Sequence, residues 1–411
     1  MASEWSLCHW GDLATLEYGR SLRDYQECAG EYPVYGTNGQ IGCWTKPLCR
    51  HPGVIVGRKG AYRGVHYSDR PFWAIDTAFY VVPKDDIDLR WAYYQLLTQD
   101  INSMDSGSAI PSTSRDDFYA LPVRLPPLPE QRRIAAILST FDEKIQLNHR
   151  MNRALESIAR AVFKSWFVDF DPVRKKMEGG DPGLPPDLAA LFPDAFEPSP
   201  LGPIPRGWHV SPLGELFRVG IGGVWGEDSP AGPTNIAVRC LRGIDLHELA
   251  EGRIPDSPIR YVSAAQLAKR QLERATLLVE GSGSFCGRSL LVLDEISSLY
   301  EEPLLYSNFC KRLDAACSPE VAVVGWMQLA CRYREGEVAS FRTGTAFPNL
   351  DMHGLLANLL VIVPPETVAR AFRAVFAATR GDTLATEAVT LGLLRDALLP
   401  RLLEGSLHAH Q

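Results

Sequence analysis

The longest periodic pattern of apolar residues in the chain runs from Pro129 to about Val168 and predicts a single long helix. No Gly or Pro interrupts the pattern before Pro172, and Glu130 places negative charge where the helix dipole favours it. At about 1.5 Å per residue, such a helix extends for roughly 55–60 Å. Its apolar positions recur in the heptad register of a helix that packs along a partner helix; they include Ile134, Leu138, Phe141, Ile145, Leu155 and Val162.

A second helical pattern, at residues 366–405, supplies a candidate partner. Gly381-Asp382 weakens its middle, and Pro400 is expected to kink its end. Asn148 and Asn152 fall on the seam of the first helix, where a polar residue fixes register and partner. We therefore expect an antiparallel coiled coil, with one long amphipathic helix of a single domain as the alternative. The apolar face of the second helix includes Phe372, Val375, Leu391, Leu394 and Leu398.

Shorter apolar runs and breaks divide the rest of the chain. Strand-like runs at Val54–Val56, Phe72–Ala74 and Phe79–Val82, separated by Gly- and Asn-rich turns, predict a mixed globular region before the long helix. A segment rich in Pro and Gly follows the helix and reads as a linker with one short helix near residues 188–191. The expected order is a first domain (1–127), the first long helix (128–170), the linker (171–207), a second domain (208–365) and the second long helix (366–405).

The two globular regions share landmarks in the same order, which indicates an internal repeat. Gly11-Asp12-Leu13 matches Gly214-Glu215-Leu216 at an offset of 203 residues. Gly107–Pro111 matches Gly344–Pro348 at an offset of 237, so the second region carries about 34 additional residues. In both halves a proline pair then leads into a long helix: Pro126-Pro127 and Pro364-Pro365.

These patterns predict an α+β fold with two similar mixed domains and a pair of long antiparallel helices. Duplicated halves usually pack about a pseudo-two-fold axis, as the subunits of a symmetric dimer do. Each helix would then carry one globular domain, at opposite ends of a stiff spacer.

Composition narrows the class of protein. A chain of 411 residues with 45% hydrophobic content suggests two or three domains with ample core. No apolar run approaches 18 residues, and no secretory signal is recognisable, so we expect no membrane span. The nine cysteines contain no CxxC pair and are expected to be reduced thiols of a cytoplasmic protein. The net charge of −7 argues mildly against nucleic-acid binding, although local basic surfaces can outweigh it.

Catalytic motifs are missing from the sequence. It contains no GxxxxGK[ST] loop, no GxGxxG after a strand, no HExxH and no metal-spaced Cys/His set. Asp142-Glu143-Lys144 could be mistaken for a nuclease fragment, but we expect it to be surface charge on the long helix. The sequence therefore favours a binding module without catalytic residues or metal ligands.

Two stretches combine cations with aromatic or hydroxyl side chains and are candidate DNA-binding loops. Arg and Lys can neutralise phosphates, Arg can pair with guanine, and Ser and Asn suit hydrogen bonds to phosphates or base edges. The alternatives are a solvated hairpin for the first stretch and an ordinary turn and strand for the second. The candidates in the first stretch are Trp44, Lys46, Arg58, Lys59, Tyr62 and Arg63, and those in the second are Ser282, Ser284, Arg288, Asn308, Lys311 and Arg312.

Several of these segments resemble the specificity subunit of type I restriction–modification systems. The resemblance rests mainly on Gly107–Pro111 and on Leu125-Pro126-Pro127-Leu128-Pro129-Glu130-Gln131 with the heptads that follow. Val54–Gly60 and Gly281–Arg288 are similar to that family's target-recognition domains, and Arg395–Leu403 is similar to its closing helix.

The resemblance implies a non-catalytic subunit that reads double-stranded DNA at a bipartite site, with one half-site for each domain. The paired helices would set the unread gap. Methyltransferase subunits and a restriction–translocase subunit would be its partners, and S-adenosylmethionine, ATP and Mg would bind to those partners, with no cofactor in this chain. Two other classes remain open: a scaffold that assembles a complex without reading DNA, and a cryptic nuclease or methyltransferase.

Overall fold

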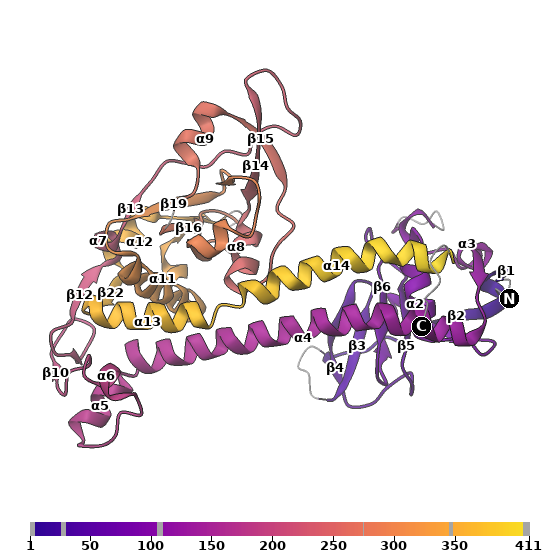
Figure 1. Cartoon of the computed structure of the whole chain (residues 1–411), viewed down its shortest axis with the longest axis horizontal. Helices are drawn as coiled ribbons and strands as arrows, with labels where there is room; N and C mark the ends of the chain where they lie inside the picture. The colour runs from indigo at the N-terminus through magenta and orange to yellow at the C-terminus, as the bar shows by residue number, and fades with distance from the viewer. Residues whose placement is uncertain (1–4, 26–29, 105–109, 274, 345–347, 406–411) are drawn as a thin grey trace. The chain divides into compact units, whose positions relative to one another are not determined.

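The computed structural model describes residues 5–25, 30–104, 110–273, 275–344 and 348–405 (Figure 1). The chain divides into two compact units: unit 1 comprises residues 1–145 and 390–411, and unit 2 comprises residues 146–389. Helix α4 (Leu128–Phe167) is continuous for 40 residues and passes from unit 1 into unit 2. The long helix predicted from the heptad pattern is therefore confirmed, within one residue at each end.

Unit 1 is built on three small sheets. A four-stranded antiparallel sheet has the order β2-β8-β5-β6, a three-stranded sheet has the order β4-β3-β7, and β1 pairs with β9. The strands are β1 (Ser6–His9), β2 (Ala14–Tyr18), β3 (Tyr32–Gly36), β4 (Gly39–Trp44), β5 (Gly53–Gly57), β6 (Val65–Ser68), β7 (Trp73–Ala74), β8 (Ala78–Pro83) and β9 (Pro122–Leu125). The helices before α4 are α1 (Trp10–Leu13), α2 (Leu89–Leu97), the 3-10 turn η2 (Ile101–Ser103) and α3 (Arg115–Ala120).

The sequence explains the core of unit 1. Strand β5 is a continuous apolar run, and every one of its residues is buried, as expected for a strand covered on both faces. Trp10 lies between Trp91 and Phe118, with ring centroids 6.4 and 5.8 Å away. Gln131, the last residue of the proline-rich motif, is buried and ties the start of α4 to its surroundings: its side chain accepts from the Asp88 amide and donates to the Pro126 carbonyl.

Unit 2 repeats this plan with additions. Its sheets have the orders β13-β19-β16-β17 and β15-β14-β18, and β12 pairs with β22. The strands are β12 (His209–Pro212), β13 (Phe217–Val219), β14 (Thr234–Leu241), β15 (Ile259–Ser263), β16 (Thr276–Glu280), β17 (Ser289–Val292), β18 (Leu304–Tyr306), β19 (Cys310–Ala315), β20 (Arg342–Thr343), β21 (Asn349–Leu350) and β22 (Leu360–Val363). Its helices after residue 207 are α7 (Leu213–Leu216), α8 (Gly243–Ala250), α9 (Ala264–Arg270), α10 (Asp294–Ser297), α11 (Pro319–Arg334), the 3-10 turn η3 (Glu337–Phe341), α12 (Met352–Asn358) and α13 (Glu366–Ala378).

The internal repeat is confirmed strand by strand. The three sheets of unit 1 recur in unit 2 with the same order and direction, including one parallel pair in each unit, β3 with β7 and β14 with β18. The match of Gly11 with Gly214, at the offset of 203 residues, also recurs in packing. A Cβ on Gly11 would lie 3.1 Å from the Tyr119 carbonyl oxygen, and one on Gly214 would lie 3.0 Å from that of Leu356.

The additional residues of unit 2 fall in identifiable places. A turn joins β3 to β4 in unit 1, whereas α8 lies between β14 and β15 in unit 2. Helices α9 and α10 occupy two further connections. Helix α11 has 16 residues, whereas its counterpart α2 has nine.

Within each unit, α4 packs antiparallel to the closing helices α13 and α14 (Asp382–Leu403). In unit 2 the Asn148 amide donates to the Leu384 carbonyl and to Glu387. Phe163, which follows Asn148 along α4, contacts Phe372, which precedes Leu384 in the chain, so the helices run in opposite directions. In unit 1, Leu138 of α4 belongs to the same hydrophobic cluster as Leu399, Leu402 and Leu403. The predicted helix pair and the positions of both seam asparagines, which are buried, are confirmed.

The weak point predicted at Gly381 is a real break. Helix α13 ends at Ala378, and α14 begins at Asp382. A Cβ on Gly381 would lie 1.6 Å from the side-chain oxygen of Asn152, so only glycine fits beside this asparagine. Pro400 lies inside α14, which nevertheless continues to Leu403.

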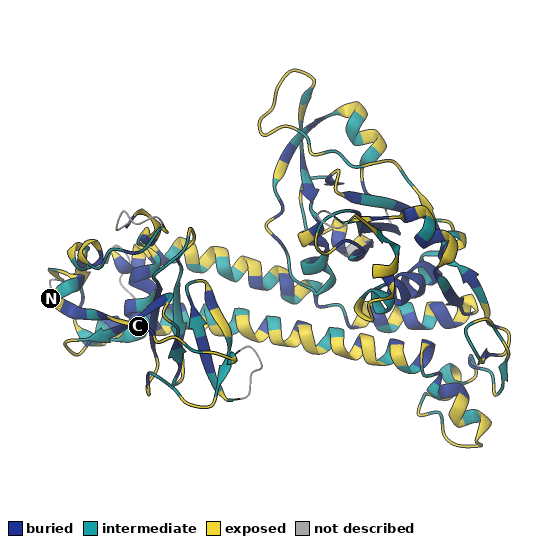
Figure 2. Ribbon diagram, turned by 180° about the vertical axis from the view of Figure 1, so that it is seen from behind, coloured by how far each residue is buried: buried dark blue, intermediate teal, exposed yellow. Residues whose placement is uncertain are grey.

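Two expectations about the helices need correction. One residue of the predicted face of the second helix is misplaced: Leu394 is 49% exposed, whereas α14 buries Leu402, as the pattern predicts, together with Ala385, Ala388 and Leu399. Asp142 is not a surface charge: it accepts from Tyr94 at 2.5 Å and pairs with Arg395 at 2.6 Å. The other predicted packing residues lie on the buried side of the helices (Figure 2): Ile134, Leu138 and Phe372 are fully buried, and Phe141, Ile145, Leu155, Val162, Val375, Leu391 and Leu398 are half-buried.

The segment 171–207 is more ordered than a linker. It forms α5 (Asp171–Met177), the expected short helix as α6 (Pro186–Ala189), and a hairpin of β10 (Phe196–Glu197) and β11 (Ile204–Pro205). Phe192 is buried between Trp166 of α4 and Trp208, at centroid distances of 5.1 and 6.4 Å. Composition suggested flexibility, but a few aromatic side chains anchor the segment in the core of unit 2.

Two further expectations concern the whole chain. The cysteines of the described ranges are free thiols. Among the same residues, no helix combines the length and apolar character that crossing a membrane requires.

Candidate nucleic-acid interface

The two candidate loops occupy equivalent positions in the two units. Residues 58–64 connect β5 to β6 in unit 1, and residues 281–288 connect β16 to β17 in unit 2. Both loops begin at the end of a central strand of the four-stranded sheet. The repeat therefore presents two versions of one loop on the same scaffold.

Each loop is held by the segment that carries the repeated Ile/Phe-Pro motif. In unit 1 the Gly60 amide donates to the Pro111 carbonyl at 3.0 Å. In unit 2 the Gly283 amide donates to the Pro348 carbonyl, also at 3.0 Å. Gly60 has a φ of +119° and Gly283 a φ of +110°, values that favour glycine. Residues 105–109 and 345–347, which contain the rest of each motif, lie outside the described residues.

Arg58 is held in place at the start of the loop of unit 1. Its guanidinium donates to the Asp76 carbonyl at 2.8 Å and lies 4.8 Å from the centroid of the Tyr18 ring. Arg115 lies 5.3 Å from the same centroid and donates to the Tyr119 hydroxyl. Hydrogen bonds with Tyr119 and Tyr18 raise the pKa of Arg115. Two cations fixed around one half-exposed ring suit a negatively charged phosphate backbone.

The other candidates of unit 1 divide into accessible and internal side chains. Tyr62 is 80% exposed at the tip of the loop, and Lys59 is half-buried beside Ser112. Lys46 is exposed and follows β4, which ends at the half-buried Trp44. Arg63 is internal.

Arg63 does not present its charge to a ligand. It is 4% exposed, and its guanidinium donates to the carbonyls of Asn102 at 2.7 Å and Ile101 at 3.4 Å. Its backbone amide donates to the Asn102 side chain at 2.7 Å. The sequence indicated a surface cation, but the structure makes Arg63 a clamp that holds the loop against η2.

The loop of unit 2 presents aromatic rings. Phe285 is 51% exposed, and the Arg288 guanidinium stacks 3.7 Å from its centroid. Phe309 is 54% exposed, and its carbonyl accepts from the Gly281 amide, as the Thr77 carbonyl accepts from the Arg58 amide in unit 1. Of the predicted residues, Ser284 and Asn308 are exposed, and Ser282 and Lys311 are half-buried.

Arg312 is the second candidate whose charge is engaged internally. Its side chain is 12% exposed, pairs with Asp314 at 2.6 Å and donates to the Gln271 carbonyl at 3.2 Å. It lies on β19 rather than in the loop. Its arrangement stabilises the sheet and leaves little of the guanidinium for DNA.

Sequence reasoning missed Tyr18 and Arg115, and it named the stretches that contain Phe285 and Phe309 without selecting either ring as a contact. A signal existed for Arg115, because it lies four residues after the repeated motif, which ends at Pro111. Tyr18 gave none, because it joins the loop only through the sheet. The described residues contain no cluster of three or more His, Cys, Asp or Glu side chains that could hold a metal.

Comparisons with known proteins point to one family. Residues 2–157 match the model of the type I restriction modification DNA specificity domain. The chain is 21% identical to the type I restriction enzyme MjaIX specificity subunit of Methanocaldococcus jannaschii, covering 80% of this chain and 72% of that one. It is 24% identical to the HindI specificity subunit of Haemophilus influenzae, covering 72% and 71%.

A solved structure shares the fold. The S subunit of a type I restriction–modification system from M. genitalium superposes with a TM-score of 0.56 and 19% identity, covering 97% of this chain and 96% of that one. Together with the repeated sheets and the paired helices, these matches confirm the resemblance seen in the sequence: residues 2–157 match the specificity domain, and most of the chain is similar to type I restriction enzyme specificity subunits.

Proposed function

We propose that this chain is the DNA-reading subunit of a type I restriction–modification complex, with one half-site of a bipartite duplex read by each unit. The observation that carries the proposal is the pair of equivalent loops, fixed by the same backbone hydrogen bonds and carrying different accessible side chains. A shared scaffold suits one kind of ligand, and different side chains suit different base sequences.

The half-sites would be contacted in different ways. In unit 1, Arg58 and Arg115 are cations with restrained geometry, which suits phosphates or guanine edges. In unit 2, the exposed rings of Phe285 and Phe309 suit contacts with thymine methyl groups or partly unstacked base steps. Salt should therefore affect the contribution of unit 1 more strongly than that of unit 2.

The chemistry of restriction and modification would belong to partner proteins in the cytoplasm. Methyltransferase subunits would bring S-adenosylmethionine, and a restriction–translocase subunit would bring ATP and Mg. This chain would act without catalysis, by choosing the DNA site and bringing those subunits together.

The test is binding to DNA of defined sequence. The methylated motif of the host genome supplies the bipartite site, and fluorescence anisotropy measures the affinity of the purified chain for it. We expect affinity to fall at least tenfold when either half-site is scrambled, and also when the gap changes by a few base pairs. Equal affinity for all of these duplexes would contradict the proposal.

The alternative is an assembly scaffold that binds partner proteins without reading DNA. The long helices, which would serve equally well for assembly alone, favour it. It predicts that the chain binds methyltransferase subunits while retaining no DNA at moderate salt, so the two functions separate in one pair of binding assays.

A further inference from the structure

A glycine-rich segment of unit 2, residues 220–226, directly follows β13, and a pair of glycines gives its place in the repeat. A Cβ on Gly19 of unit 1 would lie 2.6 Å from the Ala74 carbonyl oxygen, so only glycine fits there. A Cβ on Gly223 would lie 2.5 Å from the Tyr306 carbonyl oxygen in the same way. Residues 220–226 are therefore the counterpart in unit 2 of the segment that follows β2.

In unit 2 this segment is continuous with the candidate DNA loop. The Val224 amide donates to the Tyr306 carbonyl at 3.0 Å, which ties the segment to the end of β18. The turn that follows β18 carries Phe309, whose carbonyl accepts from the Gly281 amide at 2.8 Å. Because unit 1 places Tyr18 and its two cations at the equivalent position, the segment of unit 2 belongs to the same candidate interface.

The segment exposes apolar side chains in place of those cations. Ile221 is 39% exposed and Trp225 is 38% exposed, and Val219 at the end of β13 is also exposed. Together with Phe285 and Phe309, these residues extend the exposed apolar surface of unit 2 beyond the loop and the turn. Large apolar side chains that are exposed close together mark interaction sites, whereas scattered ones need no explanation.

An arginine fixes the Trp225 ring. The Arg260 guanidinium lies 4.7 Å from the centroid of this ring and donates to the carbonyls of Trp225 and Gly226. It also pairs with Asp228, and the Arg260 side chain is buried. The charge of Arg260 is therefore engaged within the protein, and its effect is to hold the ring in one orientation.

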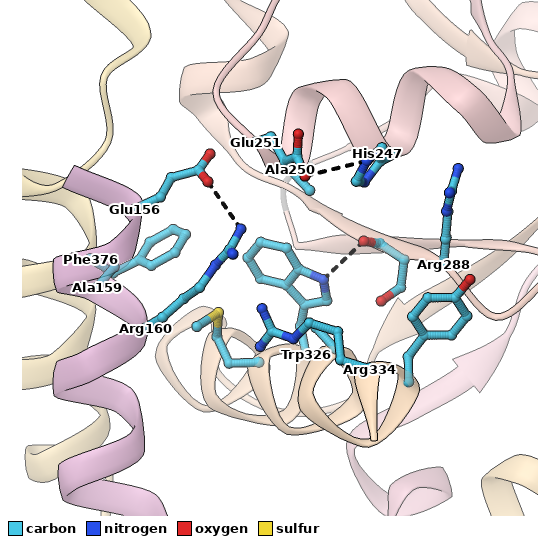
Figure 3. A pocket seen from close by; sticks show the side chains of 14 residues that line it. Glu156, Ala159, Arg160, His247, Ala250, Glu251, Arg288, Trp326, Arg334 and Phe376 are labelled. Atoms are coloured by element: carbon cyan, nitrogen blue, oxygen red, sulfur yellow. Dashed lines mark hydrogen bonds and ion pairs between the residues drawn. The ribbon is translucent and has the colours of Figure 1, made fainter. Parts of the chain in front are cut away.

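The ring of Phe285 is supported in the same way. The Arg288 guanidinium lies 3.7 Å from its centroid. Arg288 also lines a cavity of about 230 Å³, where Figure 3 shows its side chain extending away from Arg160 and Arg334. Arg288 thus supports Phe285 and does not join the other arginines of the cavity. Phe285 and Trp225 are both rings with an arginine over one face and the remainder exposed.

This geometry narrows the part of DNA that the segment fits. A ring inserted between base steps needs both of its faces, and Arg260 already occupies one face of Trp225. Glu227 and Asp228, which follow the segment, are exposed carboxylates that repel phosphates. Apolar side chains that stay outside the base stack and away from the backbone meet the base edges, where the thymine 5-methyl is the apolar group of the major groove.

We propose that residues 221–225 are a second reading element of unit 2, in which Ile221 and Trp225 contact thymine 5-methyl groups in the major groove. Arg260 is a positioning residue for the Trp225 ring. The proposal deepens the proposed function and rests on it, because it assumes that unit 2 reads duplex DNA. It requires at least one A·T pair in the half-site of unit 2.

The experiment uses the full chain and the bipartite duplex given by the methylated motif of the host genome. Each thymine of the motif is replaced in turn by deoxyuridine, which lacks only the 5-methyl group. Fluorescence anisotropy measures the affinity of the wild-type, Ile221→Ala and Trp225→Ala chains for every duplex. Ile158→Ala is the matched control, because Ile158 is an exposed isoleucine on α4 in the same unit. Circular dichroism checks that each variant is folded.

We expect the wild-type chain to lose about fourfold in affinity at one or more thymines of one half-site, the effect of burying one methyl-sized group. Ile221→Ala should bind the unmodified duplex about fourfold more weakly, and Trp225→Ala about tenfold. At the thymine that each variant no longer contacts, deoxyuridine should cause no further loss. Ile158→Ala should behave as the wild-type chain does.

A wild-type chain that prefers the bipartite site but binds thymine and deoxyuridine duplexes equally would overturn the proposal. Equal deoxyuridine losses in the variants and the wild-type chain, or a half-site of unit 2 without an A·T pair, would overturn it as well. If Trp225→Ala does not fold, Ile221→Ala decides the matter, because it leaves the stack of Trp225 on Arg260 intact. A wild-type chain that binds scrambled duplexes as tightly as the bipartite site would instead overturn the proposed function.

Discussion

The two units present different chemistry on one scaffold. At the equivalent loop, unit 1 places Arg58 and Arg115 around the Tyr18 ring, and unit 2 exposes Phe285 and Phe309. The same kind of hydrogen bond fixes both loops: the Gly60 and Gly283 amides each donate to a proline carbonyl at 3.0 Å. The comparison teaches that the duplicated framework determines where each loop lies, while a few side chains determine what it can contact.

The helix pairs of the two units differ in a similar way. In unit 1 an ion pair between Asp142 and Arg395 joins α4 to α14, with Tyr94 as a third member. In unit 2 a neutral amide, Asn148, bonds to α14 at a comparable place. One pair therefore depends on compensated charge, and the other on a buried asparagine.

Breaking the ion pair between Asp142 and Arg395 should have the largest effect on stability. Asp142→Ala leaves Arg395 and the Tyr94 hydroxyl without their shared partner, and we expect a loss of about 2–4 kcal/mol, since both charges are mostly buried. Asn148→Ala in unit 2 should cost about 1–2 kcal/mol. Chemical denaturation of the full chain measures both. Asp396→Ala, which removes the exposed partner of Arg395, is the control and should cost less than 0.5 kcal/mol, about the value of a surface ion pair. If Asp142→Ala lowered the free energy of unfolding as little as this control does, Asp142 would not be what holds α4 to α14.

Removing the accessible groups of the loops should weaken DNA binding in two distinguishable ways. We expect Arg58→Ala and Arg115→Ala each to weaken binding about tenfold and to lower the salt slope by about one. Lys59→Ala should act in the same direction with a smaller effect. Phe285→Ala and Phe309→Ala should weaken binding to a similar extent, with the salt slope unchanged, because the rings carry no charge.

Anisotropy titrations at several salt concentrations measure both quantities for these variants. Arg124→Ala is the control in unit 1, because Arg124 is exposed on β9 and away from the loop. An unchanged salt slope in the Arg58, Lys59 and Arg115 variants would remove the loop of unit 1 from the interface.

Straining the two loops should have equal effects in the two units. Alanine at Gly60 or Gly283 has room, with the nearest atoms 3.8 and 3.5 Å from its Cβ, so the backbone conformation alone opposes it. We expect each substitution to cost about 1–2 kcal/mol and to loosen its own loop. Hydrogen exchange of the loop amides measures this locally. A large effect in one unit and none in the other would show that the loops are not anchored alike.

The smallest expected effect is a pH dependence confined to unit 2. Burial raises the pKa of Glu156 to about 7 from its ordinary 4.5, despite the nearby Arg160. Because the folded state then holds this proton more tightly, the contribution of Glu156 to the free energy of unfolding should be greatest below pH 4.5 and fall as the pH rises to about 7. We expect Glu156→Gln to remove about 1 kcal/mol of this decline, discounted for partial exposure of the carboxyl group. Thermal midpoints between pH 4.5 and 8 test it, and identical profiles for both proteins would contradict it.

The sequence predicted the features that depend on regular spacing. The heptads of α4, the seam asparagines, the break at Gly381 and the repeated motifs all have a period or an order that is visible without coordinates. Their prediction succeeded because helices and duplications leave periodic traces in a sequence.

Features that depend on contacts between distant residues were predicted poorly. Arg63 and Arg312 look like surface cations until Asn102 and Asp314 are brought beside them. Asp142 looked exposed because its partner Arg395 lies 253 residues away. Leu394 was expected on the buried face of α14 but is 49% exposed, because only coordinates show which residues of this helix meet α4.

The central claim is that each unit reads one half of a bipartite site, and base-by-base specificity profiles test it most directly. Binding selection from a duplex library would compare the wild-type chain with an Arg58→Ala/Arg115→Ala variant and a Phe285→Ala/Phe309→Ala variant. The account predicts that the first variant relaxes the preference in one half-site only and that the second relaxes it in the other half-site only. Both variants relaxing the same half-site, or neither changing the profile, would contradict it.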